Sequence, residues 1–265
     1  MAARTTDPTP YLAANAVLRL LLQEVRAVLG PEFVGMYCYG SLSLGDFEPG
    51  SSDIDFLVVT ANDLPDEMVA ALGAMHGRIA VSGLQWADKL EGSYIPRAAL
   101  RRYDPTNNRH PTIGVDWAFG IGEHDNSWII ERHIVREHGV VIYGPPPETL
   151  IDPISSNQLR AAVRGALDGF WRERLDGPEP EWLRTREYQA FAILTMCRAL
   201  YVLAHGEVVS KPAAAAWARD TLPPPWPDLI AKALIWRHDK HPDDMTEMLA
   251  FIRYTIERAT VIHSG

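Results

Sequence analysis

The stretch that most constrains the fold is an Asp-x-Asp pair at the start of an apolar segment. Asp53 and Asp55 lead directly into residues 56–59, Phe-Leu-Val-Val, which have the composition of a buried β-strand. Side chains two residues apart on a strand project from the same face, so the two carboxylates would lie side by side. Such a pair is repulsive unless a divalent cation lies between the groups, and oxygen ligands suit magnesium. The pair therefore predicts a magnesium site at the start of this strand.

A glycine-serine turn precedes the acidic pair. An apolar run from Phe33 to Tyr39 predicts a first strand, and Gly40-Ser41 follows it directly. Glycine lets the backbone approach a ligand closely, and serine adds a hydroxyl beside the exposed amides of the turn. Taken alone, the turn is an ordinary loop and the acidic pair a solvated strand end. Their combination favours a site for a metal-bound phosphate.

Glu91 is the candidate for a third carboxylate. It lies among strand-forming residues in the segment 88–96, which Pro96 ends. A solvent-exposed glutamate on an edge strand is the structural alternative. The interpretation we favour is a third strand of the same sheet, which would bring Glu91 to the face of the acidic pair. There it could bind metal or accept the proton of an attacking hydroxyl.

The order of these motifs resembles the nucleotidyltransferase superfamily that includes polymerase beta. It is more closely similar to the aminoglycoside nucleotidyltransferases that adenylylate streptomycin and spectinomycin. The similarity rests on residues 39–41, Tyr-Gly-Ser, and residues 52–55, Ser-Asp-Ile-Asp. The resemblance implies two magnesium ions and ATP as co-substrate, with Glu91 as the general base. It also implies metal ligands Asp53, Asp55 and Glu91, and nucleotide contacts Gly40, Ser41 and Ser52.

The chain changes character after residues 144–147, Gly-Pro-Pro-Pro, which form its strongest break. Helical and strand patterns alternate before the break, whereas only amphipathic helices follow it. We therefore expect an α/β nucleotidyltransferase domain over residues 1–150. An all-α helical bundle that binds substrate and nucleotide is expected over residues 151–265, with the active site between the domains. The polar segment 97–112 is expected to be a surface loop.

Two basic residues of the helical half are candidate phosphate ligands. Arg198 lies in an apolar helix, where a charge needs a partner or a polar cleft, and an internal salt bridge is the alternative. Lys211 follows Ser210 at a helix start, where a lysine and free amides together favour phosphate; an exposed surface lysine is the alternative. The resemblance assigns both to the ATP phosphates, because Arg198, Tyr201, Gly206 and Lys211 follow the family's order.

The resemblance also implies contacts to the acceptor. Trp117, in an Asp-Trp pair, would stack against the aminoglycoside, with plain core packing as the alternative. The family places an acidic residue upstream of the arginine, but an ungapped count reaches Tyr188 here. The acid is then Glu187 beside it, or Glu181, or it is absent.

The composition of the chain disfavours several classes of partner and site. The 265 residues carry a formal net charge of −9, which disfavours long nucleic acid and suits a small cationic substrate. Cys38 and Cys197 have the surroundings of buried hydrophobic residues, and the histidine pairs 133/138 and 238/241 have no zinc-site spacing. The sequence shows no apolar run that would span a membrane and no apolar core of a signal peptide, so we expect a cytoplasmic protein.

The motifs, together with what the resemblance implies, predict a magnesium-dependent enzyme that transfers AMP from ATP to a hydroxyl of an aminoglycoside antibiotic, giving drug resistance. We expect a monomer or weak dimer without a nucleic-acid or membrane partner. One alternative is a nucleotidyltransferase that modifies a protein or tRNA, which the acidic charge disfavours for tRNA. Another is a catalytically silent nucleotide-binding regulator, for which three clustered carboxylates would have no use.

Overall fold

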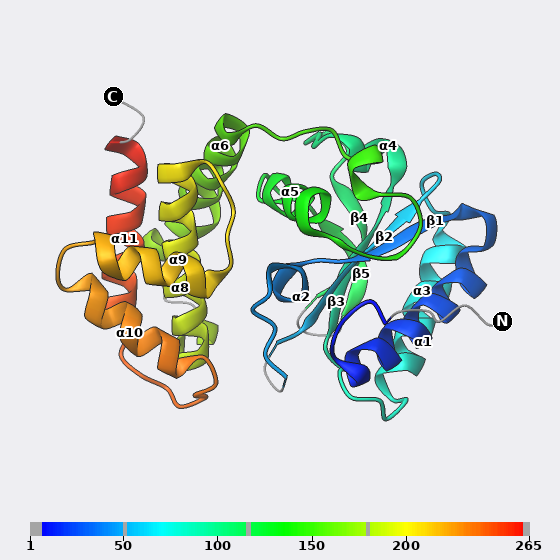
Figure 1. Cartoon of the computed structure of the whole chain (residues 1–265), viewed down its shortest axis with the longest axis horizontal. Coiled ribbons are helices and arrows are strands. Elements are labelled where there is room, and N and C mark those ends of the chain that lie inside the picture. The colour runs from blue at the N-terminus through cyan, green and yellow to red at the C-terminus, as the bar shows by residue number, and fades with distance from the viewer. Residues whose placement is uncertain (1–6, 50–51, 115–117, 179–180, 262–265) are drawn as a thin grey trace. The chain divides into compact units, whose positions relative to one another are not determined.

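A computed structural model describes residues 7–49, 52–114, 118–178 and 181–261 of the chain. It divides into two units between Pro153 and Ile154. Unit 1 combines helices with a sheet, and the described part of unit 2 is helical (Figure 1). The fold class expected from the sequence is therefore confirmed. The expected domain division was at residue 150, three residues before the division in the structure.

Unit 1 is organised by its sheet, which has six strands among the described residues, in the order β5-β4-β3-β2-β1-β6. β2 and β3 run parallel, and the other neighbouring pairs are antiparallel. The strands are β1 (Phe33–Cys38), β2 (Ile54–Thr60), β3 (Leu90–Pro96), β4 (Arg109–Ile113), β5 (Phe119–Glu123) and β6 (Val140–Tyr143). The strands that carry the sequence motifs are therefore central, whereas β5 and β6 form the edges.

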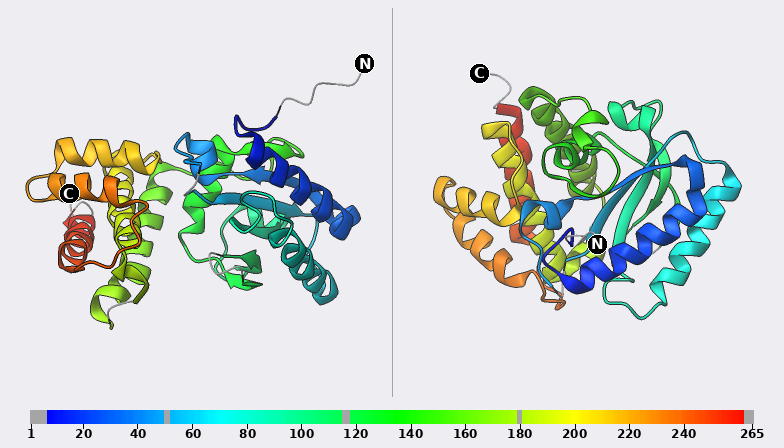
Figure 2. Two further views of the ribbon diagram at one scale, coloured as in Figure 1. Left: turned by 90° about the horizontal axis from the view of Figure 1, so that it is seen from below. Right: turned by 45° about the vertical axis from the view of Figure 1, so that its right-hand side comes forward.

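Two helices, α1 and α3, lie together and share a core with one face of the sheet, as Figure 2 shows for the blue and cyan helices. Phe56, Val58 and Tyr94 contribute to that core from the sheet. Alternation along the strands then turns the odd-numbered residues of β2 and β3 toward the opposite face. The helical segments of unit 1 are α1 (Leu12–Leu29), η1 (Gly30–Glu32), α2 (Gly40–Leu44), α3 (Asp66–Ala80), α4 (Arg97–Arg101), α5 (Trp128–His138) and η2 (Pro147–Thr149).

Unit 2 is packed around one long helix, α8, which contacts α6, α9, α10 and α11. Buried small and aliphatic side chains such as Ala190, Ile193 and Leu200 allow this close packing. Gly206 ends the helix in a left-handed conformation, φ +72°, and Arg160 Nε donates to the Leu203 carbonyl at 3.0 Å. The segments are α6 (Ser156–Ala166), η3 (Leu167–Trp171), α7 (Arg172–Asp176), η4 (Glu181–Arg184), α8 (Arg186–His205), α9 (Lys211–Thr221), α10 (Trp226–Trp236) and α11 (Thr246–Val261).

The expectation of a surface loop over residues 97–112 is wrong. The segment contains α4 and most of β4, which pairs with β3 on one side and β5 on the other. Pro111 within β4 and the polar residues around it give no strand pattern, so hydrogen bonding to two neighbours decides the conformation. A separate expectation concerned membranes: the described part of the chain holds no helix with the length and apolarity to cross one.

A buried histidine contributes to the core of unit 1. The ring of His76 on α3 stacks on Phe56 and Phe119, and its Nε2 lies 2.7 Å from the Tyr94 hydroxyl. Burial lowers the pKa of His76 from 6.5 to about 4. The unfolded chain therefore binds a proton at this residue below about pH 6.5, whereas the folded chain does so only near pH 4. Stability from neutral His76 is complete above pH 6.5 and is lost as the pH falls toward 4.

The substitution His76→Gln tests this dependence, because glutamine can keep a hydrogen bond to Tyr94 but does not titrate. Between about pH 7 and about pH 5, the fall in the free energy of unfolding should be smaller in the variant by about 1–2 kcal/mol. Urea denaturation at both pH values measures it. His138→Gln, at an exposed position of α5, is the matched control and should leave the fall unchanged. A fall in His76→Gln equal to that of the parent protein would contradict the assignment.

Candidate active site

Asp55 and Glu91 are direct neighbours in the sheet. The parallel register of β2 and β3 pairs Asp55 with Glu91 and Phe56 with Gly92. Paired residues project from the same face, about 4.8 Å apart at the backbone, so the two carboxylates lie side by side. Both are half-buried between fully buried neighbours, on the face opposite α1 and α3. Because β3 lies between β2 and β4, Glu91 is not on an edge strand.

Gly40 lies against the Asp55 carboxylate. The Tyr39 N–H donates to the Asp55 carbonyl at 3.1 Å, which fixes the end of β1 beside β2. Gly40 then adopts φ +61°, and a Cβ at this position would overlap Oδ2 of Asp55. Backbone conformation and lack of space both require glycine here. Because no side chain covers it, the backbone at residue 40 can approach a ligand of the carboxylates closely.

The structure differs from the sequence expectation on both sides of this contact. Gly40 and Ser41 do not form a simple turn; they begin the short helix α2, whose first amides have no partners within the helix. Asp53 lies immediately before β2 rather than within it. The Ser52 hydroxyl accepts the Glu48 N–H at 2.9 Å, and the Ser52 carbonyl accepts Trp86 Nε1–H at 3.0 Å. Ser52 thus anchors the segment that leads into Asp53.

Tyr39 indicates the charge on this face of the sheet. Its ring is buried, with its centroid 6.5 Å from that of Trp128 on α5. Burial is the first cause that holds the Tyr39 pKa well above its ordinary value, and the carboxylates of Asp55, Glu131 and Glu91 follow. Glu131 is a residue that sequence reasoning missed, because a glutamate on an amphipathic helix does not differ from a surface residue. The face therefore concentrates negative charge.

The oxygen donors of this face suit a hard cation such as magnesium. The fit rests on the side-by-side position of Asp55 and Glu91, with Asp53 two residues before Asp55. Among the described residues, no group of three or more His, Cys, Asp or Glu side chains is arranged to hold a metal ion. The three-carboxylate ligand set expected from the sequence therefore stays a prediction.

The two predicted phosphate ligands lie on neighbouring helices of unit 2. Arg198 is half-buried on α8, and no ion pair or hydrogen bond joins its side chain to another described residue, which excludes an internal salt bridge within that part of the chain. Lys211 is the first residue of α9. Ser210 caps this helix by accepting the Ala213 N–H at 3.3 Å. The Lys211 Nζ lies 4.1 Å from the centroid of the Phe191 ring.

The predicted acceptor contacts are placed only in part. Trp117 lies outside the described residues. Glu187 is half-buried in the first turn of α8, and its N–H donates to the Asp239 carbonyl at 2.8 Å. Glu181 is exposed and forms an ion pair with Arg184 at 2.9 Å. Tyr188, reached by the ungapped count, packs edge-on against Trp182.

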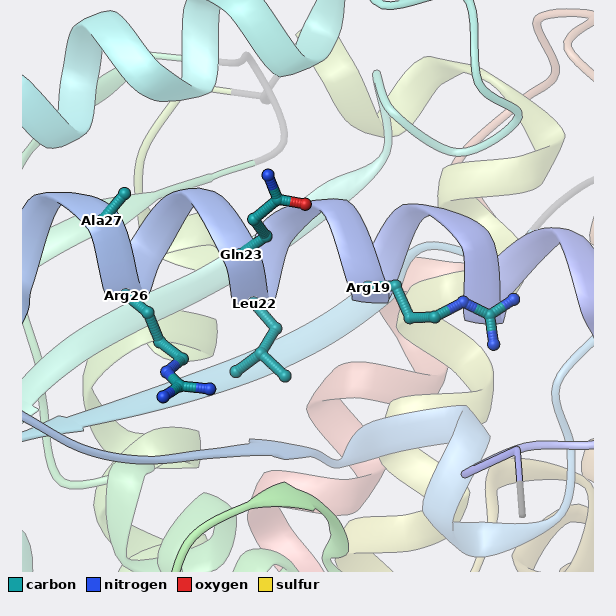
Figure 3. A pocket seen from close by; sticks show the side chains of 5 residues that line it. All are labelled: Arg19, Leu22, Gln23, Arg26 and Ala27. Carbon is teal, nitrogen blue, oxygen red and sulfur yellow. The ribbon is translucent and has the colours of Figure 1, made fainter. Parts of the chain in front are cut away.

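A shallow depression of about 430 Å³ lies elsewhere on unit 1. Figure 3 shows that the side chains around it come from α1: Arg19, Leu22, Gln23, Arg26 and Ala27. None of the predicted site residues lines it. The depression is therefore a surface feature apart from the carboxylates of β2 and β3.

Two family models match the chain, one in each unit. Residues 18–101 match the nucleotidyltransferase domain, and residues 149–259 match the aminoglycoside adenylyltransferase C-terminal domain. The chain belongs to the aminoglycoside nucleotidyltransferase family. Its N-terminal match contains Gly40, Asp53, Asp55 and Glu91, and its C-terminal match contains both predicted cations of unit 2.

Similar proteins agree with this family. The chain is 26% identical over 272 residues to the aminoglycoside (3'') (9) adenylyltransferase of Klebsiella pneumoniae, covering 91% of this chain and 95% of that protein. It is 25% identical over 216 residues to the spectinomycin 9-adenylyltransferase of Staphylococcus aureus, covering 76% of each. A crystal structure of the spectinomycin adenyltransferase AAD(9) from Enterococcus faecialis, with ATP and spectinomycin, shares the fold. Its TM-score is 0.72 at 18% identity, covering 92% of this chain and 98% of that one.

The contact between Gly40 and Asp55 can be tested with a matched pair of glycines. Gly40 and Gly45 both have positive φ, but nothing lies within 4 Å of a Cβ at Gly45. Alanine should therefore cost about 1–2 kcal/mol of stability at either position through backbone strain. Only Gly40→Ala should also displace the Asp55 carboxylate and weaken Mn²⁺-ATP binding, by roughly ten-fold or more, because Asp55 is a predicted ligand of the cation. Calorimetric titration of both variants measures this, and equal Mn²⁺-ATP affinities would contradict the proposed contact.

Proposed function

We propose that this chain transfers AMP from ATP to a hydroxyl of an aminoglycoside antibiotic of the streptomycin or spectinomycin type and so confers resistance to the drug. The observation that carries the proposal is the side-by-side position of Asp55 and Glu91 on β2 and β3. It occurs in a chain that matches both domains of the family, and whose relatives carry the names of adenylyltransferases.

Asp53 and Asp55 are the proposed magnesium ligands, and Glu91 would add a further oxygen to a site for two ions. Magnesium is usually held by one or two carboxylates together with phosphate oxygens and water, so the acidic pair and a bound triphosphate can complete a site. When bound, the metal neutralises the triphosphate and the leaving pyrophosphate. The backbone at Gly40 would pass close to the phosphates, with amides of α2 as donors. Ser41 and Ser52 are the proposed hydroxyl contacts; Ser52 keeps its O–H to donate, because its oxygen accepts the Glu48 N–H.

Glu91 is the proposed general base. It would accept the proton of the acceptor hydroxyl while that oxygen forms a bond to the α-phosphorus of ATP. The bond from the α-phosphorus to the bridging oxygen breaks, and pyrophosphate leaves with the electron pair. The phosphoryl group carries negative charge throughout, so cations must act with the carboxylates. Arg198 and Lys211 are the proposed cations, and Trp117, Glu187 and Glu181 are the proposed acceptor contacts.

Pyrophosphate release with ATP and magnesium tests the function against a panel of streptomycin, spectinomycin and several 2-deoxystreptamine drugs. We expect release with one or two drugs, none without an acceptor, and loss of release in Asp53→Asn. Silence across the panel with ATP still bound would contradict aminoglycoside transfer. Release with a protein or tRNA acceptor instead would establish the alternative reaction, and ATP binding without transfer to any acceptor would favour a silent regulator.

Glu91→Gln separates catalysis from binding. The amide keeps the size of the side chain but cannot accept the proton, so kcat should fall by about 10²–10⁴-fold. The affinity for ATP should change far less, because Asp53 and Asp55, the proposed ligands of the ion that ATP carries, are unchanged in the variant. Single-turnover kinetics and ATP titration give the two values. Glu67→Gln, on the exposed side of α3, is the matched control. Turnover near that of the parent enzyme in Glu91→Gln would show that another group takes the proton.

A further inference from the structure

Phe191 is an exposed aromatic side chain with a lysine over its ring. The side chain lies on α8 and is 42% exposed, and the Lys211 Nζ is 4.1 Å from the ring centroid. Helix α8, which carries Phe191, and helix α9, which begins at Lys211, pack against each other in unit 2 (Figure 1). The face of an aromatic ring carries negative potential and attracts an ammonium group at this distance. The pair is therefore a cation–π contact between neighbouring helices.

Lys211 lies in the first turn of α9, where the helix itself does not stabilise a positive charge. A cation in the first turn of a helix is disfavoured by the positive end of the helix dipole. Side chains of a helix also lean toward its N-terminus, which carries the Lys211 side chain away from the body of α9. The Phe191 ring offsets the unfavourable dipole by receiving the ammonium. The ring thus contributes a favourable contact for a charge that the helix itself does not favour.

Phe191 shares a stripe of α8 with Arg198. Residues 191, 195 and 198 follow the i, i+4, i+7 spacing, so their side chains lie on one side of the helix. No ion pair or hydrogen bond joins the side chain of Arg198 to another described residue, and Thr195 Oγ1 is buried without a hydrogen-bond partner in that part of the chain. Seven residues of helix separate Phe191 and Arg198 by about 10 Å. The lysine over the ring therefore brings a second cation to the side of α8 that carries Arg198.

We infer that Phe191 is a positioning residue that holds the Lys211 ammonium on the Arg198 side of α8, so that one polyphosphate chain meets both cations. The ring itself contacts the lysine and not the reacting atoms. The inference rests on the proposed function in one respect, because it takes the polyanion to be the triphosphate of the nucleotide. The proposed reaction alone does not require an aromatic side chain at residue 191, whereas the positioning of Lys211 does.

Inorganic tripolyphosphate is the probe, because it carries the anionic chain without a base, a sugar or an acceptor. Calorimetric titration of the full chain should give a dissociation constant about two- to five-fold higher for Phe191→Leu, which keeps apolar volume but loses the ring. Phe191→Tyr should keep the affinity of the parent chain. The effect of Phe191→Leu should vanish in a Lys211→Ala background, because the ring acts only through the lysine.

Phe170→Leu is the matched control. Phe170 is also an exposed aromatic residue, at 37%, and its ring also carries a cation, Arg174, but it lies outside the stripe. Its loss should not change the affinity for tripolyphosphate. Phe191 also lies near Trp171, with ring centroids 6.5 Å apart. An equal loss on Phe191→Leu with and without Lys211 would assign the effect to that packing and overturn the inference.

The remaining outcomes separate the inference from the proposed function. Unchanged tripolyphosphate affinity in Phe191→Leu would overturn the positioning role even where AMP transfer occurs. Absence of tripolyphosphate binding by the parent chain would overturn it as well. Coupled loss of affinity in the Phe191 and Lys211 variants, without AMP transfer to any acceptor, would support the inference while the proposed function failed. Melting temperatures of all variants confirm that each one is folded.

Discussion

The parallel pairing of β2 with β3 is the constraint on which the site depends. This register places Asp55 directly beside Glu91, and a shift by one residue would turn one of the two carboxylates to the opposite face. Two like charges side by side oppose the pairing, so other interactions must maintain it. The apolar residues of the same strands maintain the pairing, because Phe56 on β2 and Tyr94 on β3 are fully buried in the core with α1 and α3. Apolar burial on one face of the sheet thus fixes acidic groups on the other.

The same constraint explains the backbone at the end of β1. The hydrogen bond from the Tyr39 N–H to the Asp55 carbonyl brings the chain against the carboxylate, and Gly40 is the residue that fits there. The chain then turns into α2, whose first amides have no intrahelical partners. Acidic side chains and backbone donors therefore lie next to each other, which is an arrangement that a metal-bound phosphate can satisfy. Unit 2 has the complementary chemistry, because Lys211 and Arg198 lie on neighbouring helices that pack together.

Local sequence patterns predicted part of this arrangement. The spacing of Asp53 and Asp55 indicated a shared face, and apolar runs located β1, β2 and the helices of unit 2. The register that pairs Asp55 with Glu91 could not be derived, because it depends on contacts between distant segments. β4 was missed for the same reason, since Pro111 and its polar neighbours form a strand only between two others. The contact of Phe191 with Lys211 joins two helices, and no local pattern in the sequence of either helix predicts it.

The most direct test of the central claim is a crystal structure with Mn²⁺ and a non-hydrolysable ATP analogue, with the metal located by anomalous scattering. We expect an anomalous peak within coordination distance of Asp53 and Asp55 oxygens and of the phosphates, with Glu91 beside it. A nucleotide bound with its metal away from β2 and β3 would contradict the assignment of this face as the active site. A peak at the acidic pair, with the Glu91 carboxylate beside it, would support this face of β2 and β3 as the active site.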